Sequence, residues 1–183
     1  MTALHAPPVF SLPAALLSQG YRLRPETDAD IPFLMQVYAS TRAYELESVP
    51  WSDAQKQAFI AHQFNAQRHH YRTSIPACVF QVIEHQGAGI GRLYLEPRET
   101  MIYIVDIALL PEHCGRGLGT AILRALQATA GGGGGGGGVN IMVEKLNPAL
   151  RFYQRLGFTD VADHDVYLEM EWMPRSRRTS LDN

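Results

Sequence analysis

Short apolar runs and amphipathic stretches follow one another along the chain. Runs rich in β-branched and aromatic residues predict strands over residues 21–27, 78–84, 90–96, 101–111, 139–145 and 166–173. Spacings of three and four between apolar positions predict helices from Thr27 or Asp28 to about Ser40, and over residues 53–71, 121–130 and 148–156. This order, with an antiparallel meander in the middle, predicts an α/β (α+β) domain.

Two local signals predict where helices begin and end. Ser52, followed three residues later by Gln55, forms a capping box that predicts a helix start at residue 53. Eight consecutive glycines at 131–138 are poor helix formers, so the preceding helix is predicted to stop near Ala130. A hinge, a low-complexity loop and a stand-in for unidentified residues are all compatible with the glycine run, and we assign it no function.

Length and composition indicate one domain. The chain has 183 residues, of which 46% are hydrophobic and 19% charged, enough for one buried core. We expect the domain to span residues 21–174, after a poorly ordered extension over 1–20 with one helical turn near 14–17. Residues 175–183 are predicted to be a disordered C-terminal tail.

Charge and cysteine content exclude several classes of protein. The formal net charge of −2 provides no overall basic field for nucleic acid or an anionic membrane surface. No apolar run approaches the roughly 20 residues that span a bilayer, and the N-terminus lacks the basic start of a secretory signal. Cys78 and Cys114 lack the spacing of a zinc site or a disulfide framework. We therefore expect a cytoplasmic protein with no metal, nucleic-acid or membrane partner.

A glycine-rich corner, HCGRGLGT at residues 113–120, follows the fourth predicted strand and precedes an amphipathic helix. The dinucleotide fingerprint requires a glycine where Thr120 stands, and the Walker P-loop requires a lysine, but the two lysines are Lys56 and Lys145. What remains is a loop whose backbone N–H groups meet an anion at a helix N-terminus. A pyrophosphate is the natural occupant.

The residues around this corner resemble a known family. VDIALLPEHCGRGLGTAILRAL resembles the acetyl-coenzyme A motif of the GNAT superfamily of N-acetyltransferases, and NPALRFYQRLGF resembles its second signature. The resemblance spans roughly residues 21–173, with both motifs in the expected order. It implies a mixed, mostly antiparallel central sheet flanked by helices, and acetyl-CoA as co-substrate.

The same resemblance implies which residues hold acetyl-CoA. Backbone groups of Ile107 and Leu109 are expected on the pantetheine arm and the acetyl carbonyl, and Asn147 is a further cofactor-binding position. The family usually has Gln or Arg where Cys114 stands, so we expect weakened binding; the thiol is more simply a small filler than a reactive group. The pyrophosphate is expected on Cys114, Gly115, Arg116, Gly117, Leu118, Gly119 and Thr120.

Tyr153 is the strongest catalytic candidate. Periodicity places it with Ala149, Phe152 and Leu156 on one face of a helix that begins after Asn147, which alone indicates a core residue. Its match to the tyrosine position of the family implies instead a general acid that protonates the departing thiolate.

The sequence leaves the general base open. The position where some relatives carry a glutamate holds Tyr103 here, so that role does not transfer. Asp106 lies on the same strand, but its side chain points to the opposite face unless a β-bulge intervenes. A structural Asp106 that bonds backbone amides at a kink, and deprotonation of the amine through water, are alternatives to a catalytic Asp106.

Substrate binding is expected in the first two helices and the loop between them. Glu45 would attract a cationic amine and Trp51 would form an apolar wall; a solvated helix end and a packed loop aromatic are the alternatives. The expected function is acetyl transfer from acetyl-CoA to a primary amine of a small molecule in a ternary complex. A protein lysine or N-terminal acetyltransferase and a non-catalytic acyl-CoA sensor are the alternatives, and a homodimer is compatible with each.

Overall fold

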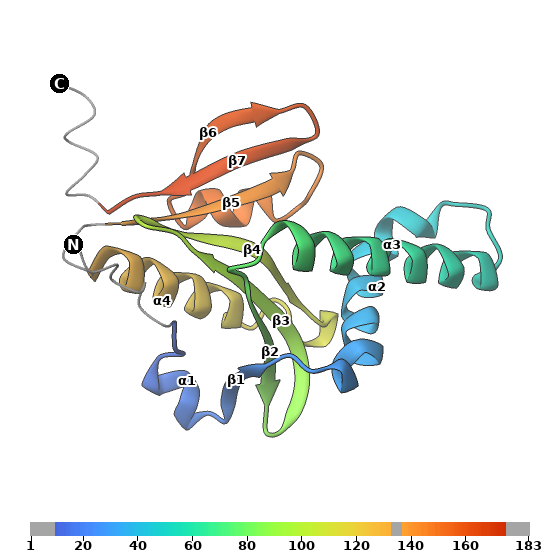
Figure 1. Ribbon diagram of the computed structural model, residues 1–183, viewed down its shortest axis with the longest axis horizontal. Coiled ribbons are helices and arrows are strands. Elements are labelled where there is room, and N and C mark those ends of the chain that lie inside the picture. Colours follow the sequence, from blue (N-terminus) through green and yellow to red (C-terminus); the bar gives the residue numbers. More distant parts are fainter. Residues whose placement is uncertain (1–9, 133–136, 175–183) are drawn as a thin grey trace.

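The computed structural model describes residues 10–132 and 137–174, in which helices cover both faces of a seven-stranded sheet (Figure 1). The strand order is β1-β2-β3-β4-β5-β7-β6, and all neighbours are antiparallel except β4 and β5. The predicted mixed, mostly antiparallel sheet is therefore confirmed. The strands are β1 (Tyr21–Pro25), β2 (Val79–His85), β3 (Ala88–Pro97), β4 (Met101–Leu109), β5 (Gly138–Glu144), β6 (Thr159–His164) and β7 (Tyr167–Trp172).

The helices form two groups. One face of the sheet packs against α1 (Ala14–Ser18), α4 (Leu118–Gly132) and α5 (Leu150–Arg155). The other face packs against α2 (Ile31–Glu47) and α3 (Asp53–Ser74), which form a helical hairpin on the right of Figure 1. Two short 3-10 helices, η1 (Asp28–Asp30) and η2 (Pro111–His113), precede α2 and α4. No described helix is both long and apolar enough to cross a membrane.

The helix α4 shows how the apolar pattern builds the core. Leu118, Ile122, Leu123 and Leu126 recur at helical spacing, and each is at most 4% exposed. They belong to one buried cluster with residues from most strands of the sheet. Burying a leucine or isoleucine side chain stabilises the fold by about 1.5–3 kcal/mol. This packing fixes the start of α4, and with it the glycine corner, beside β4.

The segment before β1 is part of the core. Phe10, Leu12 and Leu16 are at most 8% exposed and belong to the same buried cluster as α4. The expectation of a poorly ordered extension is therefore wrong from Phe10 onward, whereas the helical turn near 14–17 is confirmed as α1. Pro13 interrupts the apolar pattern in the sequence, yet its fixed φ suits the start of α1. Residues 1–9 and the predicted tail over 175–183 lie outside the described residues.

The other differences lie at helix ends and at one edge of the sheet. The helix α2 continues to Glu47 instead of ending near Ser40, and α4 ends at Gly132, two residues beyond the predicted stop. The strand β6 is polar and mostly exposed, as suits an edge strand, so no apolar alternation predicts it. The capping box of Ser52 and Gln55 at the start of α3 is confirmed.

The strands β4 and β5 are paired over only part of their length. Their pairing ends at Ile104 of β4. Beyond it, β4 continues beside β3, and β5 continues beside β7. A β-bulge marks the same point, because two adjacent residues of β3 pair with Asp106 and Ile104, which leaves Val105 without a partner. The sheet therefore opens between β4 and β5, and its two faces communicate there.

Candidate active site

A cleft of about 210 Å³ lies where β4 and β5 diverge. Its walls come from α2, α3, the end of β5, the open half of β4 and α5. Four tyrosines line it together with charged side chains of both signs, so it combines proton donors with carboxylates. The charged residues are Arg42, Glu45, Arg92, Asp106 and Glu144.

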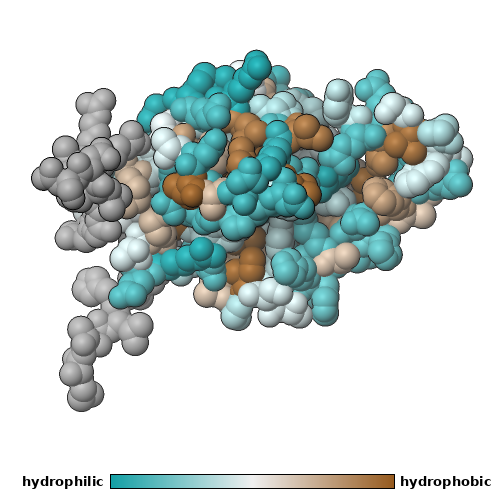
Figure 2. Space-filling model, turned by 90° about the horizontal axis from the view of Figure 1, so that it is seen from above, coloured by the Kyte–Doolittle hydropathy of each residue, from teal (hydrophilic) through white to brown (hydrophobic). Residues whose placement is uncertain are grey.

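A larger hollow of about 1040 Å³ lies between α2 and α3. Its lining is mainly apolar, with Met35, Leu46 and Ile60 among its members, and Figure 2 shows hydrophobic residues gathered at this end of the molecule. Its charged lining residues are Glu47 and Lys56, and no residue of the glycine corner borders it. By size, this hollow would be the first candidate for a binding site. The proton donors and carboxylates that acyl transfer requires, however, line the smaller cleft.

The glycine corner presents a row of free backbone donors. Within the described chain, the N–H groups of residues 115–120 donate no hydrogen bond; the first helical bond runs from Ala121 N–H to the Gly117 carbonyl at 2.9 Å. Gly115 and Gly117 have φ values of 70° and 84°, which favour glycine. A Cβ added at either position would meet no atom within 4 Å, so the space beside the loop is open. Consecutive free donors at the positive end of a helix suit an anion such as a pyrophosphate.

The other predicted cofactor-binding residues flank this row. Ile107 and Leu109 belong to the half of β4 that has no partner on the β5 side, and Ile107 borders the cleft. Leu118 is 4% exposed, so its side chain belongs to the core. The Cys114 thiol lies 3.5 Å from the Leu110 carbonyl oxygen, and partial desolvation and Glu112 raise its pKa. A protonated thiol agrees with the filler interpretation rather than with a reactive one.

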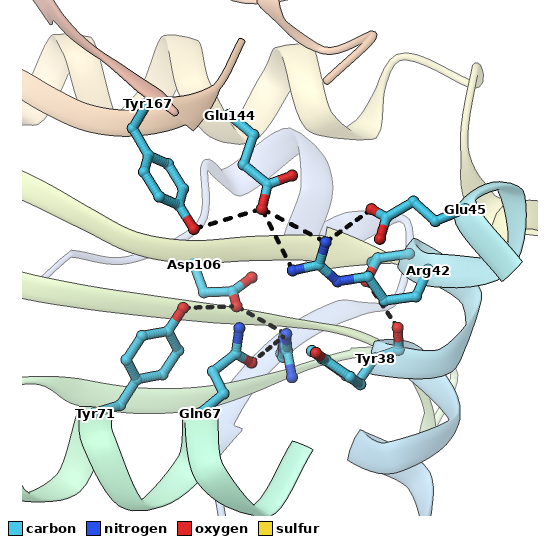
Figure 3. Close-up of polar contacts among 10 residues, drawn as sticks. Tyr38, Arg42, Glu45, Gln67, Tyr71, Asp106, Glu144 and Tyr167 are labelled. Atoms are coloured by element: carbon cyan, nitrogen blue, oxygen red, sulfur yellow. Dashed lines mark hydrogen bonds and ion pairs between the residues drawn. The ribbon is translucent and has the colours of Figure 1, made fainter. Parts of the chain in front are cut away.

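Asp106 lies at the centre of a polar cluster on the α2–α3 face of the sheet (Figure 3). Its Oδ2 accepts hydrogen bonds from Arg92 Nη2 at 2.7 Å and from the Tyr71 hydroxyl at 3.4 Å. Arg92 Nη2 also donates to Gln67 Oε1 at 3.2 Å. No described residue bonds to the other carboxylate oxygen, Oδ1, which is not a wholly buried atom. Asp106 therefore keeps one acceptor oxygen available in the cleft.

The β-bulge decides the face on which Asp106 lies. In a regular strand, Tyr103 and Asp106 would point to opposite faces. Because Val105 is an extra residue, Tyr103 and Asp106 pair with two β3 residues that lie two positions apart. Tyr103 and Asp106 therefore share a face of the sheet. The structural alternative for Asp106, bonds to backbone amides, is wrong, because its carboxylate is held by side chains.

Tyr153 reaches the cleft from the opposite face of the sheet. It is 6% exposed within the α4 cluster, and its ring packs edge-on against Phe158 with centroids 5.7 Å apart. Among the described residues its hydroxyl has no hydrogen-bond partner, and its oxygen is not wholly buried. Burial, with a smaller contribution from Asp106, raises the pKa of Tyr153, so the phenol is protonated at neutral pH. The opening between β4 and β5 thus exposes a phenol and a carboxylate to one space.

The rim of the cleft is closed by an arginine that joins α2 to β5 (Figure 3). Arg42 lies 2.7 Å from Glu45 and 3.4 Å from Glu144. The Tyr167 hydroxyl lies 3.4 Å from the same Glu144 oxygen. Glu45 therefore borders the cleft, as the substrate-binding prediction requires, but it is already paired with Arg42.

Two further predicted site residues have different outcomes. Trp51 does not border the cleft: it is 41% exposed and packs against Phe59, with ring centroids 5.3 Å apart. The packed loop aromatic is the alternative that the structure favours. Asn147 borders the cleft, and its Oδ1 accepts from the Ala149 N–H at 2.9 Å, which caps the turn before α5.

Comparison with known proteins adds to this geometry. The acetyltransferase (GNAT) domain family matches residues 76–160, a stretch that includes β4, the glycine corner, β5 and α5. This part of the chain is a GNAT acetyltransferase domain. The expectations of an acetyl-CoA-dependent N-acetyltransferase and of acetyl-CoA as co-substrate are thereby confirmed. No curated protein matches the sequence.

Solved structures share the fold of this chain at low sequence identity. A PaiA N-acetyltransferase from Thermoplasma acidophilum, in complex with coenzyme A, is 15% identical with a TM-score of 0.62, covering 84% of this chain and 99% of its own. A GCN5-related N-acetyltransferase from Rhodopseudomonas palustris is 20% identical with a TM-score of 0.58, covering 92% and 100%. The ribosomal-protein-S18-alanine N-acetyltransferase from Escherichia coli is 16% identical with a TM-score of 0.54, covering 84% and 93%.

Several polar residues of the cleft were not predicted from the sequence, among them Gln67, Tyr71, Arg92 and Glu144. Arg92 carries a detectable signal, because it is a charged residue within the otherwise apolar run IGRLYL of the strand at the centre of the meander. Gln67 and Tyr71 are four residues apart on α3 and share a face, but most of α3 is polar, so they do not stand out.

Proposed function

We propose that this GNAT protein acetylates a primary amine of a small molecule in a ternary complex with acetyl-CoA. The observation that carries the proposal is the opening between β4 and β5, through which Tyr153 and Asp106 border the same cleft. The glycine corner follows directly on β4, so a donor held there extends along the open edge of the strand into this cleft.

The chain offers mainly backbone groups to acetyl-CoA. The N–H groups of residues 115–120 would bind the pyrophosphate. Backbone groups of Ile107 and Leu109, with Asn147 nearby, would hold the pantetheine arm and the acetyl group. Acetyl-CoA supplies a thioester, whose carbonyl carbon is the electrophile.

The cleft residues would then manage two protons. The amine nitrogen bonds to the acetyl carbon, and the carbon–sulfur bond breaks with its electron pair on sulfur. The Tyr153 hydroxyl gives its proton to that sulfur, and Asp106 Oδ1 takes a proton from the amine nitrogen. Return of this proton to the Tyr153 phenolate through water restores both groups. Deprotonation of the amine by water alone is the alternative for the second proton.

The proposal of a small acceptor rests on the size and rim of the cleft. A volume of about 210 Å³ suits a small molecule, and Arg42 bridges α2 and β5 across the rim. The carboxylates of Glu45 and Glu144 would attract a cationic amine, which releases one proton to bulk water before its neutral nitrogen attacks. Cys78 and Cys114 are free thiols, which supports the proposed cytoplasmic location. A homodimer stays a prediction.

The test is an acetyl-CoA turnover assay with detection of the free thiol, run over polyamines, amino acids, aminoglycosides and lysine peptides. We expect thiol release with at least one small amine. Turnover of lysine peptides alone would replace the proposal with a protein acetyltransferase. Binding of acetyl-CoA without thiol release for any amine would replace it with an acyl-CoA sensor.

A further inference from the structure

Arg92 has more hydrogen-bond donors than the protein uses. It is 2% exposed, and both of its hydrogen bonds, to Asp106 and Gln67, start from Nη2. Its Nε is wholly buried and has no hydrogen-bond partner in the described part of the chain. Among the described residues nothing accepts from Nη1 either, but Nη1 is not a wholly buried atom, and Arg92 borders the cleft. Arg92 also borders a cavity of about 10 Å³, so the cleft of about 210 Å³ is the space with room for a ligand atom at Nη1.

A buried donor without an acceptor destabilises the fold, so buried guanidinium groups normally have their N–H groups satisfied. Over residues 10–132 and 137–174 the protein supplies oxygen acceptors for Nη2 but none for Nη1. The guanidinium carbon also lies 5.8 Å from the Tyr38 ring centroid and 5.5 Å from that of Tyr94, contacts that satisfy its charge but give Nη1 no oxygen acceptor. Arg92 lies on the α2–α3 face of the sheet, opposite the face on which α4 and the glycine corner pack. A ligand that meets Nη1 is therefore the acceptor molecule rather than the pyrophosphate of the donor.

The charges of the cleft favour a neutral oxygen at Nη1. Asp106 already balances the charge of Arg92, at 2.7 Å. The remaining charged residues are one cation, Arg42, and two carboxylates, Glu45 and Glu144. An additional carboxylate on the acceptor would add to this negative excess, whereas a carbonyl oxygen accepts from Nη1 without adding charge.

Resting on the proposed function, we propose that Arg92 Nη1 binds a carbonyl oxygen one carbon away from the reacting amine, so that the acceptor is an α-amino amide. Arg92 and Asp106 are in direct contact, which places the free Nη1 donor and the free Oδ1 acceptor on neighbouring groups. The amine and the carbonyl of an α-amino amide are separated by a single carbon and match this pair. A free amino-acid amide and a peptide N-terminus both offer this chemistry.

The probes are L-alaninamide, L-alanine, sec-butylamine and the tripeptide Ala-Ala-Ala, each assayed by thiol release with the full chain and acetyl-CoA. The amino group of a peptide or an amino-acid amide has a pKa near 8, whereas that of an alkylamine lies above 10 and that of free alanine in between, so kcat/KM is expressed per neutral amine. We expect L-alaninamide to exceed both L-alanine and sec-butylamine by at least about 10-fold. The tripeptide distinguishes a free amino-acid amide from a peptide N-terminus as the acceptor. Turnover of both L-alaninamide and the tripeptide indicates a cleft open to both classes, and turnover of only one of them identifies the class that the protein acetylates.

The matched variants are Arg92→Lys and Arg68→Lys. Lysine at 92 keeps a positive charge beside Asp106 but has a single nitrogen, so the preference for alaninamide over sec-butylamine should fall to within about 3-fold while acetyl-CoA affinity is unchanged. Arg68 also has a buried Nε without a hydrogen-bond partner among the residues that the structure describes, but it lies outside the cleft, so Arg68→Lys should keep the preference. Wild-type protein that turns over sec-butylamine as well as alaninamide overturns the inference without any variant. Absence of thiol release with every amine would instead contradict the proposed function.

Discussion

The glycine corner and the cluster around Asp106 both adjoin the open half of β4, but they are built in different ways. The corner uses main-chain N–H groups of six consecutive residues, 115–120. The cluster uses side chains from α3, β3 and β4, with Gln67, Arg92 and Asp106 far apart in the sequence. The proposed donor side of the cleft is therefore a local structure, and the proposed acceptor side is a product of the tertiary fold. Substitutions should separate the two.

The largest effect is expected from Gly117→Glu at the corner. A carboxylate would enter the open space beside the free N–H groups and repel the pyrophosphate, so coenzyme A binding should become undetectable by calorimetry. The control is Gly87→Glu, because Gly87 has a φ of 83° and the same open surroundings but lies in the β2–β3 turn. Both variants should lose about 1–2 kcal/mol of folding free energy from the left-handed backbone. Unchanged coenzyme A affinity in Gly117→Glu would remove the corner from donor binding.

This contrast also explains what the sequence could predict. The pattern Leu118, Ile122, Leu123 and Leu126 identifies α4, and the glycines before it predict an anion site, because both signals lie within a few consecutive residues. The face of Asp106 depends on the bulge at Val105, which arises from pairing with β3 and has no local signature. The partners of Arg92 likewise come from distant elements, and their proximity follows only from the packed fold.

A second large effect is expected from Asp106→Asn on the acceptor side. Arg92 would be left buried without a carboxylate, so the free energy of unfolding should fall by about 3 kcal/mol in urea denaturation. Coenzyme A affinity should stay within about 3-fold of the wild type, because no N–H group of the corner is altered. The exposed pair Lys145–Asp163 has a similar distance, 2.6 Å, and Asp163→Asn should leave stability unchanged. Equal stability of the two variants would show that the cluster is not coupled through Arg92.

Tyr153→Phe should separate catalysis from packing. The ring and its contacts with Phe158 stay, so only the hydroxyl is lost. If that hydroxyl protonates the thiolate, kcat should fall by about 100-fold while acetyl-CoA affinity changes little. The control is Tyr94→Phe, a buried tyrosine outside the cleft whose hydroxyl donates to Glu26; it should lose stability but not rate per folded molecule. If the rate of Tyr153→Phe stays within 3-fold of the wild type, Tyr153 does not protonate the thiolate and water supplies that proton.

The smallest effect is expected from Asp30, at the start of the helix that carries Arg42 and Glu45. The Arg24 guanidinium, at 2.6 Å, and the Thr27 N–H hold the pKa of Asp30 well below its usual range. A lowered folded-state pKa contributes stability above the unfolded pKa of about 4, which is lost as the pH falls below that value. Asp30→Asn should lower the free energy of unfolding by about 1–2 kcal/mol at pH 7 and by less at pH 3. A loss that is equal at both pH values would show that the ionised carboxylate is not responsible.

The most direct test of the local donor site is a ¹H–¹⁵N NMR titration of the full chain with coenzyme A. The account predicts that the amide signals of Gly115, Gly117 and Gly119 shift most strongly, because these N–H groups gain an anionic acceptor, while those of Gly20 and Gly87 stay in place. Binding of coenzyme A, established by calorimetry on the same sample, with unshifted signals for the three corner glycines would contradict the account.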